Sequence, residues 1–296
     1  MNPGRLGSTI ASVGDLYSRL KTFSSQLDNA SAPLFFVKVD VQAAFDTIPQ
    51  SAVLQLMATV PCESEYRISK HVEIKPGEGH RLDVEGQSKT KPTRKWVSLA
   101  ASLGDFQSFS HTLAASLAVD KKNTVFVENI VSQFRQREEL MELLAEHVQH
   151  NIVKISKKFY RQKKGIPQGS VLSSILCNYF YADLEAHHLG FLNSNESLLL
   201  RLIDDFLLIT TNRNHARRFV QVMHDGLPDY GVTVNPVKTL VNFEVCINNL
   251  KIARLIGSRQ FPYCGNFIDT KTLNVTKDRE RKDSCKWLLY VSLDLS

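Results

Sequence analysis

Residues 198–211 (LLLRLIDDFLLITT) place two adjacent carboxylates in the middle of an otherwise apolar run. The apolar halves on either side of Asp204 and Asp205 have the composition of buried β-strands. The stretch therefore predicts a β-hairpin with both acids at its tip. A lone Asp-Asp pair most often marks a plain hairpin turn, so the surrounding sequence has to decide whether these acids carry chemistry.

A third acid stands at the end of another predicted strand. Residues 34–41 (LFFVKVDV) are rich in aromatic and β-branched side chains, which indicates a buried strand carrying Asp40. A single acid at a strand end is usually a helix cap, a role that Asp46 also fits. Three carboxylates gathered in a sheet core, however, repel one another and are poorly solvated unless divalent cations neutralise them. Asp40, Asp204 and Asp205 are therefore predicted to hold two hard cations, the usual arrangement for phosphoryl transfer.

The order of the elements favours the chemical interpretation. A turn with two glycines at residues 165–170 (GIPQGS) follows the Asp40 strand along the chain, and a helix is predicted from Val171 to His187. Further expected elements are a helix within 1–33, a helix opened by Pro49, helices near 104–118 and 129–150, a strand near 152–160, an amphipathic helix over 213–227, a strand over 232–243 and a sheet region over 252–275.

Composition excludes several other classes of protein. The chain has 296 residues, of which 43% are apolar and 22% charged, as in ordinary globular proteins. No apolar run is long enough to predict a membrane span, and the first residues do not resemble a secretory signal. The five cysteines are an odd number without zinc-site spacing, which favours a reduced intracellular protein without structural zinc.

Positive charge is concentrated in one part of the chain. Residues 61–164 hold 18 Lys and Arg against 13 Asp and Glu, so they carry +5 of the net charge of +6. Within this part, six basic side chains occur with no acidic residue among them: Lys154, Lys157, Lys158, Arg161, Lys163 and Lys164. Such a run is either a solvated surface or a contact with a phosphate backbone, and composition leaves both interpretations open.

Five segments resemble, in order, the motifs of reverse transcriptases in their telomerase form. Residues 36–49 (FVKVDVQAAFDTIP) resemble motif A, residues 165–173 (GIPQGSVLS) motif B′, residues 200–208 (LRLIDDFLL) motif C, residues 231–239 (GVTVNPVKT) motif D and residues 261–265 (FPYCG) motif E. Leu202 stands where retroviral and retrotransposon enzymes usually have Tyr. Together the motifs span about residues 34–275.

Spacing also separates telomerases from other reverse transcriptases. Asp40 and Gly165 lie 125 positions apart, far more than is usual outside the telomerases, which carry an insertion in the fingers at this place. Residues 3–7 (PGRLG) also resemble the telomerase stretch before motif A. The resemblance implies an α+β fold: a reverse-transcriptase palm with an antiparallel sheet, part of the fingers, and a largely helical insertion. The expected divisions are a fingers-side helix (1–33), palm (34–60 and 161–275), an insertion in the fingers (61–160), and the start of the thumb or a divergent tail (276–296).

The resemblance further implies roles for individual residues. The metal site, for two Mg²⁺ ions with Mn²⁺ as the alternative, would comprise Asp40, Val41, Asp204 and Asp205. The three Asp residues and Lys238 would be catalytic, with Lys238 acting on the pyrophosphate. Nucleotide contacts would come from Phe45, Gln168, Gly169 and Lys238, and the grip on the primer end from Tyr263, Cys264 and Gly265. The ring of Phe45 would exclude a ribose 2′-hydroxyl by its bulk.

The implied activity is RNA-directed DNA polymerisation that extends telomeric DNA 3′ ends. The implied partners are a telomerase RNA template, a telomeric single-stranded DNA primer, deoxynucleoside triphosphates and telomerase accessory proteins, in the nucleus at chromosome telomeres and with no membrane. The triphosphate-clamping motifs, the RNA-binding domain and the thumb have no counterpart here, so we expect a fragment that is inactive alone. Two other interpretations stay open: a mobile-element or intron reverse transcriptase, and a non-catalytic nucleic-acid-binding module with a palm fold.

Overall fold

A computed structural model describes residues 5–27, 32–77, 91–102, 104, 107–119 and 121–279. Contacts between Cα atoms divide the chain into two compact units: Met1–Met57 with Val148–Ser296, and Ala58–His147. The predicted thumb start or tail lies almost wholly outside the described residues. No helix among those described is both long and apolar enough to cross a membrane.

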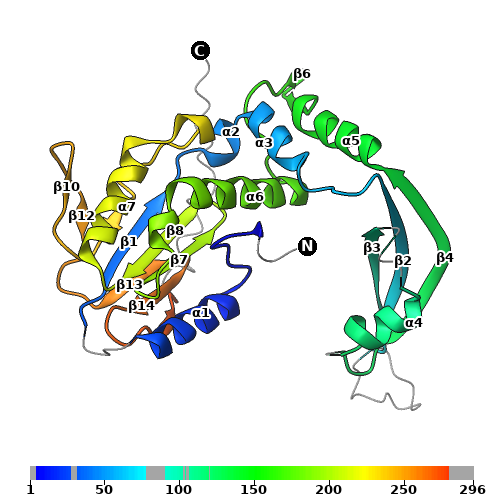
Figure 1. Cartoon of the computed structure of the whole chain (residues 1–296), viewed down its shortest axis with the longest axis horizontal. Helices are drawn as coiled ribbons and strands as arrows, with labels where there is room; N and C mark the ends of the chain where they lie inside the picture. Colours follow the sequence, from blue (N-terminus) through cyan, green and yellow to red (C-terminus); the bar gives the residue numbers. More distant parts are fainter. Residues whose placement is uncertain are drawn as a thin grey trace. The chain divides into compact units, whose positions relative to one another are not determined.

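The first unit is built on a five-stranded sheet with the order β12-β9-β1-β8-β7 (Figure 1). Its central strand β1 is antiparallel to both β8 and β9, so the antiparallel sheet predicted from the sequence is confirmed. The elements of this unit are α1 (Val13–Gln26), β1 (Phe35–Asp40), α2 (Ala44–Thr47), α3 (Gln50–Met57), β5 (Ile152–Ile155), β6 (Lys158–Arg161), α6 (Val171–His188), η3 (Gly190–Leu192), β7 (Ser197–Leu202), β8 (Asp205–Thr210), α7 (Arg213–Asp225), η4 (Pro228–Tyr230), β9 (Leu240–Val241), β10 (Cys246–Ile247), β11 (Leu250–Lys251), β12 (Ala253–Arg254), β13 (Gln260–Tyr263), β14 (Asn266–Asp269) and β15 (Val275–Lys277).

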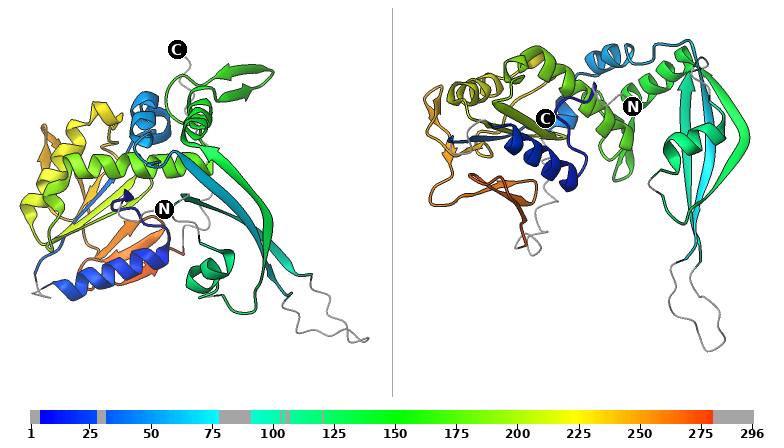
Figure 2. Two further views of the ribbon diagram at one scale, coloured as in Figure 1. Left: turned by 45° about the vertical axis from the view of Figure 1, so that its right-hand side comes forward. Right: turned by 60° about the horizontal axis from the view of Figure 1, so that its bottom comes forward.

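Both faces of the central sheet are covered, which explains why its strands are apolar along their whole length. On one face lie α6 and α7, with Tyr181 of α6 packed 5.9 Å from the ring of Phe206 in β8. On the other face lie α1 and the small sheet β13-β14-β15 (Figure 2). The core on that second side comprises Ile10, Leu16, Leu20, Phe23, Phe36, Leu200, Leu207, Ile209, Phe261, Tyr263, Ile268 and Leu273.

Polar caps mark the ends of two helices that cover the sheet. Asn212 caps α7 by accepting hydrogen bonds from the main-chain amides of Asn214 and His215. Gly226 ends that helix with a positive φ of 79°. Ser12 caps α1 in the same way through the amide of Asp15. These caps fix where each helix starts or ends. The buried apolar residues of each helix lie on the face that packs against the sheet.

The second unit differs from the largely helical insertion predicted for residues 61–160. It contains a three-stranded antiparallel sheet with the order β3-β2-β4. Its elements are β2 (Glu65–Lys75), β3 (Thr93–Ser102), α4 (Phe109–Thr112), the π-helical turn η2 (Leu113–Leu117), β4 (Val125–Gln136) and most of α5 (Arg137–Gln149). Among the described residues of this unit, helix is confined to a short stretch after residue 108 and to α5, and the prediction of a largely helical insertion was wrong.

The error in the predicted helix over 129–150 has a physical cause. Ile130 and Phe134 share helical spacing with the apolar residues of α5, yet both lie in β4. The β-branched residues Val125, Val127 and Val131 favour extended backbone, and β2 provides a strand for them to pair with. The helix begins only at Arg137, where Glu138 and Glu139 occupy its first turn. Local spacing was overridden by pairing with a distant strand.

The second compact unit ends before the last residue of the predicted insertion. The compact unit ends at His147, whereas the predicted insertion ran to residue 160. Gln50 of α3 donates hydrogen bonds to the carbonyls of Val148 and Gly165, at 3.0 and 2.9 Å. These bonds tie the chain after His147 to the first unit, so the β5–β6 hairpin belongs with the glycine-rich turn that follows it.

Candidate active site

Two of the three predicted acids face each other across neighbouring strands. Asp40 ends β1, Asp205 begins β8, and the two residues are direct partners in the antiparallel register. Directly opposed residues point to the same face of a sheet, with Cβ atoms about 5 Å apart. The main-chain amide of Val41 donates to the carbonyl of Asp204 at 3.3 Å, which places the third acid beside the end of β1.

The turn that joins β7 to β8 is strained. Leu202 and Asp205 are partners, so only Ile203 and Asp204 form the connection. Ile203 has a φ of 58°, in the left-handed region that a β-branched residue rarely adopts. Such strain persists only where surrounding contacts impose it, and it concentrates at functional sites. The hairpin predicted from the sequence is confirmed, and its tip carries Asp204.

Lys238 contacts one of the three acids. Its Nζ lies 2.8 Å from Oδ2 and 3.3 Å from Oδ1 of Asp40, and this hydrogen-bonded contact raises the pKa of Lys238. The turn that presents it is fixed by the amide of Asn235, which donates to the carbonyl of Asp40 at 3.2 Å. Because this turn interrupts the strand predicted over 232–243, only Leu240–Val241 pair with β1.

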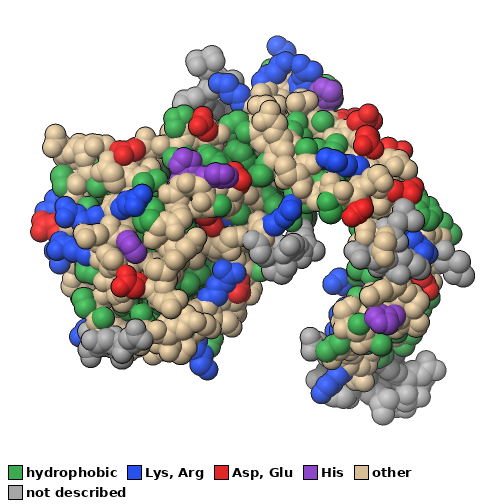
Figure 3. Space-filling model, viewed as in Figure 1, with side chains coloured by type: hydrophobic (Ala, Val, Ile, Leu, Met, Phe, Trp, Pro, Cys, Tyr) green, Lys and Arg blue, Asp and Glu red, His purple; other side chains and the backbone are tan. Residues whose placement is uncertain are grey.

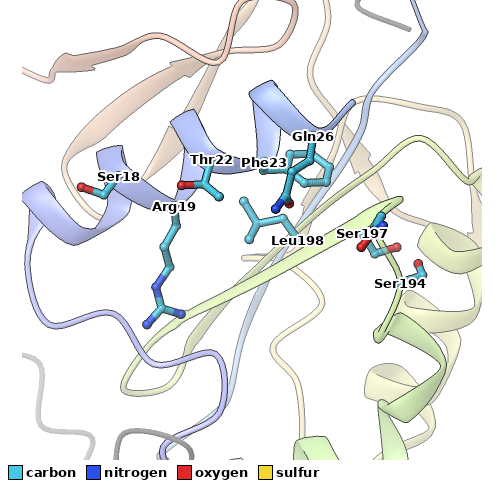
Figure 4. Close-up of a pocket in the computed structure, with 9 residues that line it drawn as sticks. Ser18, Arg19, Thr22, Phe23, Gln26, Ser194, Ser197 and Leu198 are labelled. Carbon is cyan, nitrogen blue, oxygen red and sulfur yellow. The ribbon is translucent and has the colours of Figure 1, made fainter. Parts of the chain in front are cut away.

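Two of the acids, Asp40 and Asp205, line a cavity of about 260 Å³. Its walls are formed by Lys38, Asp40, Asp205, Val237, Lys238, Thr239, Leu240 and Ala253. A second cavity of about 270 Å³ lies between α1 and the start of β7 (Figure 4). That cavity is lined by Ser and Thr residues with Arg19, whose side chain is bound to Asp15 and to the carbonyl of Thr9. The first cavity alone combines carboxylates with lysines, so it is the candidate for chemistry.

Burial and mutual repulsion perturb the acids. Burial, together with the nearby carboxylates of Asp205 and Asp40, raises the pKa of Asp204 to about 6. Burial and the charge of Asp40 also raise the pKa of Asp205, whereas the positive charge of Lys38 lowers it. Burial is the larger cause of both shifts, and the neighbouring carboxylates add to it. Carboxylate oxygens that are buried and close to one another suit a hard divalent cation.

The three carboxylates do not converge as they stand. Within the described residues, no three His, Cys, Asp or Glu side chains form a group that could hold a metal ion. Asp40 is engaged by Lys238, and Oδ2 of Asp205 accepts a hydrogen bond from the Cys264 thiol at 3.6 Å. The donor chemistry therefore fits a hard cation, while its binding would require Lys238 to leave Asp40.

The residues predicted to grip the primer lie against Asp205. The Tyr263 hydroxyl donates to the main-chain carbonyl of Asp205 at 3.0 Å. Cys264 and Gly265 form the β13–β14 turn, both with positive φ. Burial and the neighbouring Asp205 raise the pKa of the Cys264 thiol to about 12, so it stays protonated and acts as a donor. This turn therefore supports the position of the Asp205 carboxylate.

The glycine-rich turn packs against the loop after β1. The amide of Ile166 donates to the carbonyl of Phe45 at 2.7 Å, and Gln168 Nε2 donates to both carboxylate oxygens of Asp46 at 3.1 Å. A Cβ on Gly165 would lie 2.2 Å from the Phe45 carbonyl oxygen, so only glycine fits there. At Gly169 no heavy atom lies within 4 Å of where a Cβ would stand, so its positive φ of 82° rather than a close contact favours glycine there.

The basic run forms an exposed hairpin. In strands β5 and β6, Ile152 pairs with Arg161 at one end and Ile155 pairs with Lys158 at the other. Every residue of both strands is exposed. Phe159 is 70% exposed, with Lys154 Nζ 5.6 Å from its ring centre. Lys and Arg side chains gather at this place on the surface, at the top of Figure 3. Lys157, which lies in the turn, and Lys163 and Lys164 are exposed as well.

Sequence reasoning missed one charged residue beside the turn. Arg201 lies in β7 with no exposed surface, and its Nε is 2.6 Å from Oε1 of Glu185 in α6. Its Nη1 also donates to the carbonyl of Ile203 at 3.1 Å. The signal was present in the sequence, because a single arginine between Leu200 and Leu202 in an apolar strand has to be paired.

The raised pKa of Asp204 predicts how stability depends on pH. A carboxyl whose pKa rises on folding favours the folded state at low pH, and this contribution is lost as the pH rises from about 4 through about 6. In buffer without divalent cations, Asp204→Asn should match the unsubstituted chain near pH 4 and exceed its free energy of unfolding at pH 7.5 by about 1–2 kcal/mol, after allowance for solvent screening.

Urea unfolding followed by circular dichroism measures this difference at both pH values. Asp229→Asn makes the same change of charge at an exposed site and serves as the control. A variant Asp204→Asn less stable than the unsubstituted chain at pH 7.5 would show that the Asp204 carboxylate is not under repulsion.

Curated proteins similar to this chain include telomerase reverse transcriptases. Over 285 residues it is 34% identical to a telomerase reverse transcriptase of Rattus norvegicus, covering 94% of this chain and 25% of that protein. The chain thus spans about a quarter of the length of the curated relatives that it matches.

Solved structures show the same fold at lower identity. Apo telomerase from Candida tropicalis, truncated from its C-terminal domain, superposes with a TM-score of 0.58 at 21% identity, covering 92% of this chain and 41% of that one. Telomerase from Candida albicans, in complex with a TWJ fragment of telomeric RNA, gives 0.61 at 18%, covering 94% and 36%. Residues 101–288 match the family described as reverse transcriptase (RNA-dependent DNA polymerase). With the paired acids at the tip of its central hairpin and more than half of its length matched, the chain belongs to the reverse transcriptase family.

Proposed function

We propose that this chain carries the nucleotide-transfer centre of a telomerase-type RNA-directed DNA polymerase, which extends the 3′ end of a telomeric DNA primer on an RNA template. The observation that carries the proposal is the direct register of Asp40 with Asp205, beside a strained turn that presents Asp204. Similarity to telomerase reverse transcriptases supports the telomerase type. An RNA partner is supported by the relative from Candida albicans, whose structure contains telomeric RNA.

Enzymes of this family generally use divalent metal ions. Here Asp40, Val41, Asp204 and Asp205 would hold two Mg²⁺ ions, or Mn²⁺ in their place. When bound, such ions lower the pKa of the primer 3′-hydroxyl and stabilise the departing pyrophosphate. The raised pKa values of Asp204 and Asp205 support this assignment, because a nearby cation would remove the cost of ionising them.

Lys238 has two positions in this proposal. Without cations its ammonium group compensates the charge of Asp40. With the acids occupied, the 61% exposed side chain is free to turn toward the pyrophosphate, where it donates a proton or stabilises negative charge. In the first position Lys238 stabilises the negative charge of Asp40 before the substrate binds. In the second position it acts on the pyrophosphate.

Other residues of the first unit would hold the two substrates. Phe45 is half-buried five residues after Asp40, so its ring would lie beneath the sugar of a nucleotide bound at the acids. Gln168 and Gly169 would contact the nucleotide from the glycine-rich turn. Tyr263, Cys264 and Gly265 would hold the primer end against Asp205, to which the first two are already hydrogen-bonded.

The β5–β6 hairpin would contact the phosphate backbone through Lys154, Lys157, Lys158, Arg161, Lys163 and Lys164. Every one of them is exposed, with no acidic residue within the run. The base of the hairpin is joined to the glycine-rich turn by Gln162, which donates to the carbonyl of Ile166 at 3.2 Å. A strand held on the hairpin would therefore lead toward the proposed nucleotide site.

Salt dependence tests this contact. Neutralising Lys157 and Lys158 to Gln should reduce the slope of log affinity against log salt by about 1.5, because each phosphate contact contributes about 0.7–0.9. Binding to a labelled single strand is measured by fluorescence anisotropy between low and moderate salt. Lys251→Gln with Lys271→Gln changes the charge equally at exposed sites outside the hairpin. An equal loss of slope in both double variants would assign the effect to net charge alone.

The proposed activity is tested by extending a DNA primer on an RNA template with deoxynucleoside triphosphates and Mg²⁺, in an enzyme that contains this chain. Extension that stops when Mg²⁺ is chelated supports the proposal. Binding of primer and template without extension would make the chain a nucleic-acid-binding module. Preference for a telomeric primer would support action at telomeres in the nucleus.

A further inference from the structure

Arg201 makes more hydrogen bonds than a structural ion pair requires. Its side chain has no exposed surface, and all three guanidinium nitrogens are engaged. Nε donates to Glu185 Oε1 at 2.6 Å, Nη1 to Asn178 Oδ1 at 3.0 Å and to the Ile203 carbonyl at 3.1 Å, and Nη2 to Thr9 Oγ1 at 2.8 Å, the Asn178 carbonyl at 3.1 Å and the Leu6 carbonyl at 3.4 Å. The rings of Tyr181 and Phe206 lie within 5.7 Å of its Cζ.

Stability alone does not account for a charge at this place. A buried ion pair usually contributes no more to stability than apolar side chains of the same size would. Leu200 and Leu202 show that β7 accepts such side chains on its other face. What an apolar residue could not supply is a donor to the main chain of the turn. The fork of a guanidinium can bind Glu185 through one nitrogen and still reach the Ile203 carbonyl with another.

The carbonyl that Arg201 reaches belongs to the strained residue of the turn. Ile203 holds a φ of 58°, and the next residue is Asp204. A bond to the Ile203 carbonyl fixes the orientation of the peptide plane between these two residues. That plane determines where the Asp204 side chain points, because only one peptide separates the two Cα atoms. Arg201 thus controls the direction of an acid that it does not touch.

The segment before α1 completes the arrangement. Ser8 donates to Glu185 from its amide at 2.7 Å and from its hydroxyl at 2.6 Å. The same segment pairs with the outer edge of β7, where the amide of Ile10 donates to the Arg201 carbonyl at 2.8 Å and the amide of Arg201 to the Ser8 carbonyl at 3.0 Å. Residues 6–10 therefore hold both Arg201 and its carboxylate partner.

We propose that Arg201, oriented by Glu185 and residues 6–10, is a positioning residue that fixes the Ile203–Asp204 turn and thereby aims the Asp204 carboxylate into the proposed active site. The importance of Asp204 rests on the proposed function, but the geometry can be tested without any cation. The main-chain amide of Val41 donates to the Asp204 carbonyl, so its hydrogen exchange reports on the position of the turn.

Amide exchange measured by NMR compares Val41 with Phe36, whose amide donates to Asn242 Oδ1 at the other end of β1. Arg201→Lys keeps a positive charge for Glu185 but lacks the second arm that reaches Ile203. This variant should raise the ratio of the amide exchange rate of Val41 to that of Phe36 about tenfold, because the turn opens locally more often while the rest of β1 stays closed. Leu184→Ala, which leaves a cavity in α6 beside Glu185, should lower overall stability and leave this ratio unchanged.

A milder variant keeps the test decisive if Arg201→Lys does not fold. Thr9→Val removes one acceptor of Nη2 without a change of shape, and should raise the same ratio by about threefold. An unchanged ratio in the folded Arg201 variant, or in Thr9→Val when that one alone folds, would overturn the proposal. So would an equal rise in Leu184→Ala, because the effect would then follow stability rather than the turn.

Manganese binding separates this inference from the proposed function. In calorimetric titrations of the same chains, Arg201→Lys should weaken Mn²⁺ binding by about tenfold, as loss of a residue that orients a ligand does. Asp204→Ala should weaken it further, and Leu184→Ala should leave it unchanged. If Asp204→Ala binds Mn²⁺ as the unsubstituted chain does, the metal site of the proposed function fails, while the exchange ratio still decides the role of Arg201.

Discussion

Replacing Asp205 with Asn is expected to lower kcat for primer extension by about a thousandfold or more in an enzyme that contains this chain. The substitution preserves size and the hydrogen bond to Cys264, but removes the charge that faces Asp40 in the strand register. The KM for the nucleotide should change much less, because the lost interaction acts mainly on charge that develops during the reaction.

Single-turnover primer extension at saturating nucleotide measures this effect. Asp229→Asn is the matched control, since it makes the same atomic change at an exposed position of η4. Retention of more than about a tenth of the rate in Asp205→Asn would place the reacting groups elsewhere in the chain.

Replacing Phe45 with Ala is expected to lower the preference for deoxynucleotides over ribonucleotides by about a hundredfold. Phe45 lies in α2, and its main-chain carbonyl accepts a hydrogen bond from the amide of Ile166 at 2.7 Å, so the glycine-rich turn holds the backbone that carries the ring. In the proposed role, the aromatic ring would leave no room for a 2′-hydroxyl. Its removal should raise ribonucleotide incorporation and retain much of the deoxynucleotide rate.

The measurement is the ratio of kcat/KM for dGTP and GTP on one primer–template. Phe191→Ala truncates another half-buried phenylalanine of the same unit and controls for general loss of packing. If the ratio is the same in both variants, Phe45 is a core aromatic without a role in sugar selection.

The main features of the candidate site could be predicted because they are local. Apolar runs on both sides of Asp204 and Asp205 predict a hairpin whatever the rest of the chain does. Gly165 marks a close approach of main chains, where a Cβ would lie 2.2 Å from the Phe45 carbonyl oxygen. The hairpin does not depend on which other strands pair, so it could be predicted from the sequence alone. At Gly165 the sequence predicted a turn, but the close approach to Phe45 appears only in the structure.

Other features depend on partners that are distant in the sequence. Lys238 and Asp40 are in contact although they lie 198 positions apart in the sequence. Lys238 stands in a turn, whereas the sequence predicted a strand over residues 232–243. Strand β4 forms because β2 offers an edge, although Phe134 shares helical spacing with α5. Arg201 was visible as a charge in an apolar strand, but its bond to Ile203 depends on the backbone of the turn.

Counting the cations that the acids bind tests the central claim most directly. Calorimetric titration of the chain with Mn²⁺ should give a stoichiometry of about two ions per chain at neutral pH. Asp40→Asn and Asp204→Asn should each remove at least one ion, while Asp229→Asn should bind as the unsubstituted chain does. Binding of no ion by the unsubstituted chain, or equal binding by all four proteins, would contradict a reaction centre built on Asp40, Asp204 and Asp205.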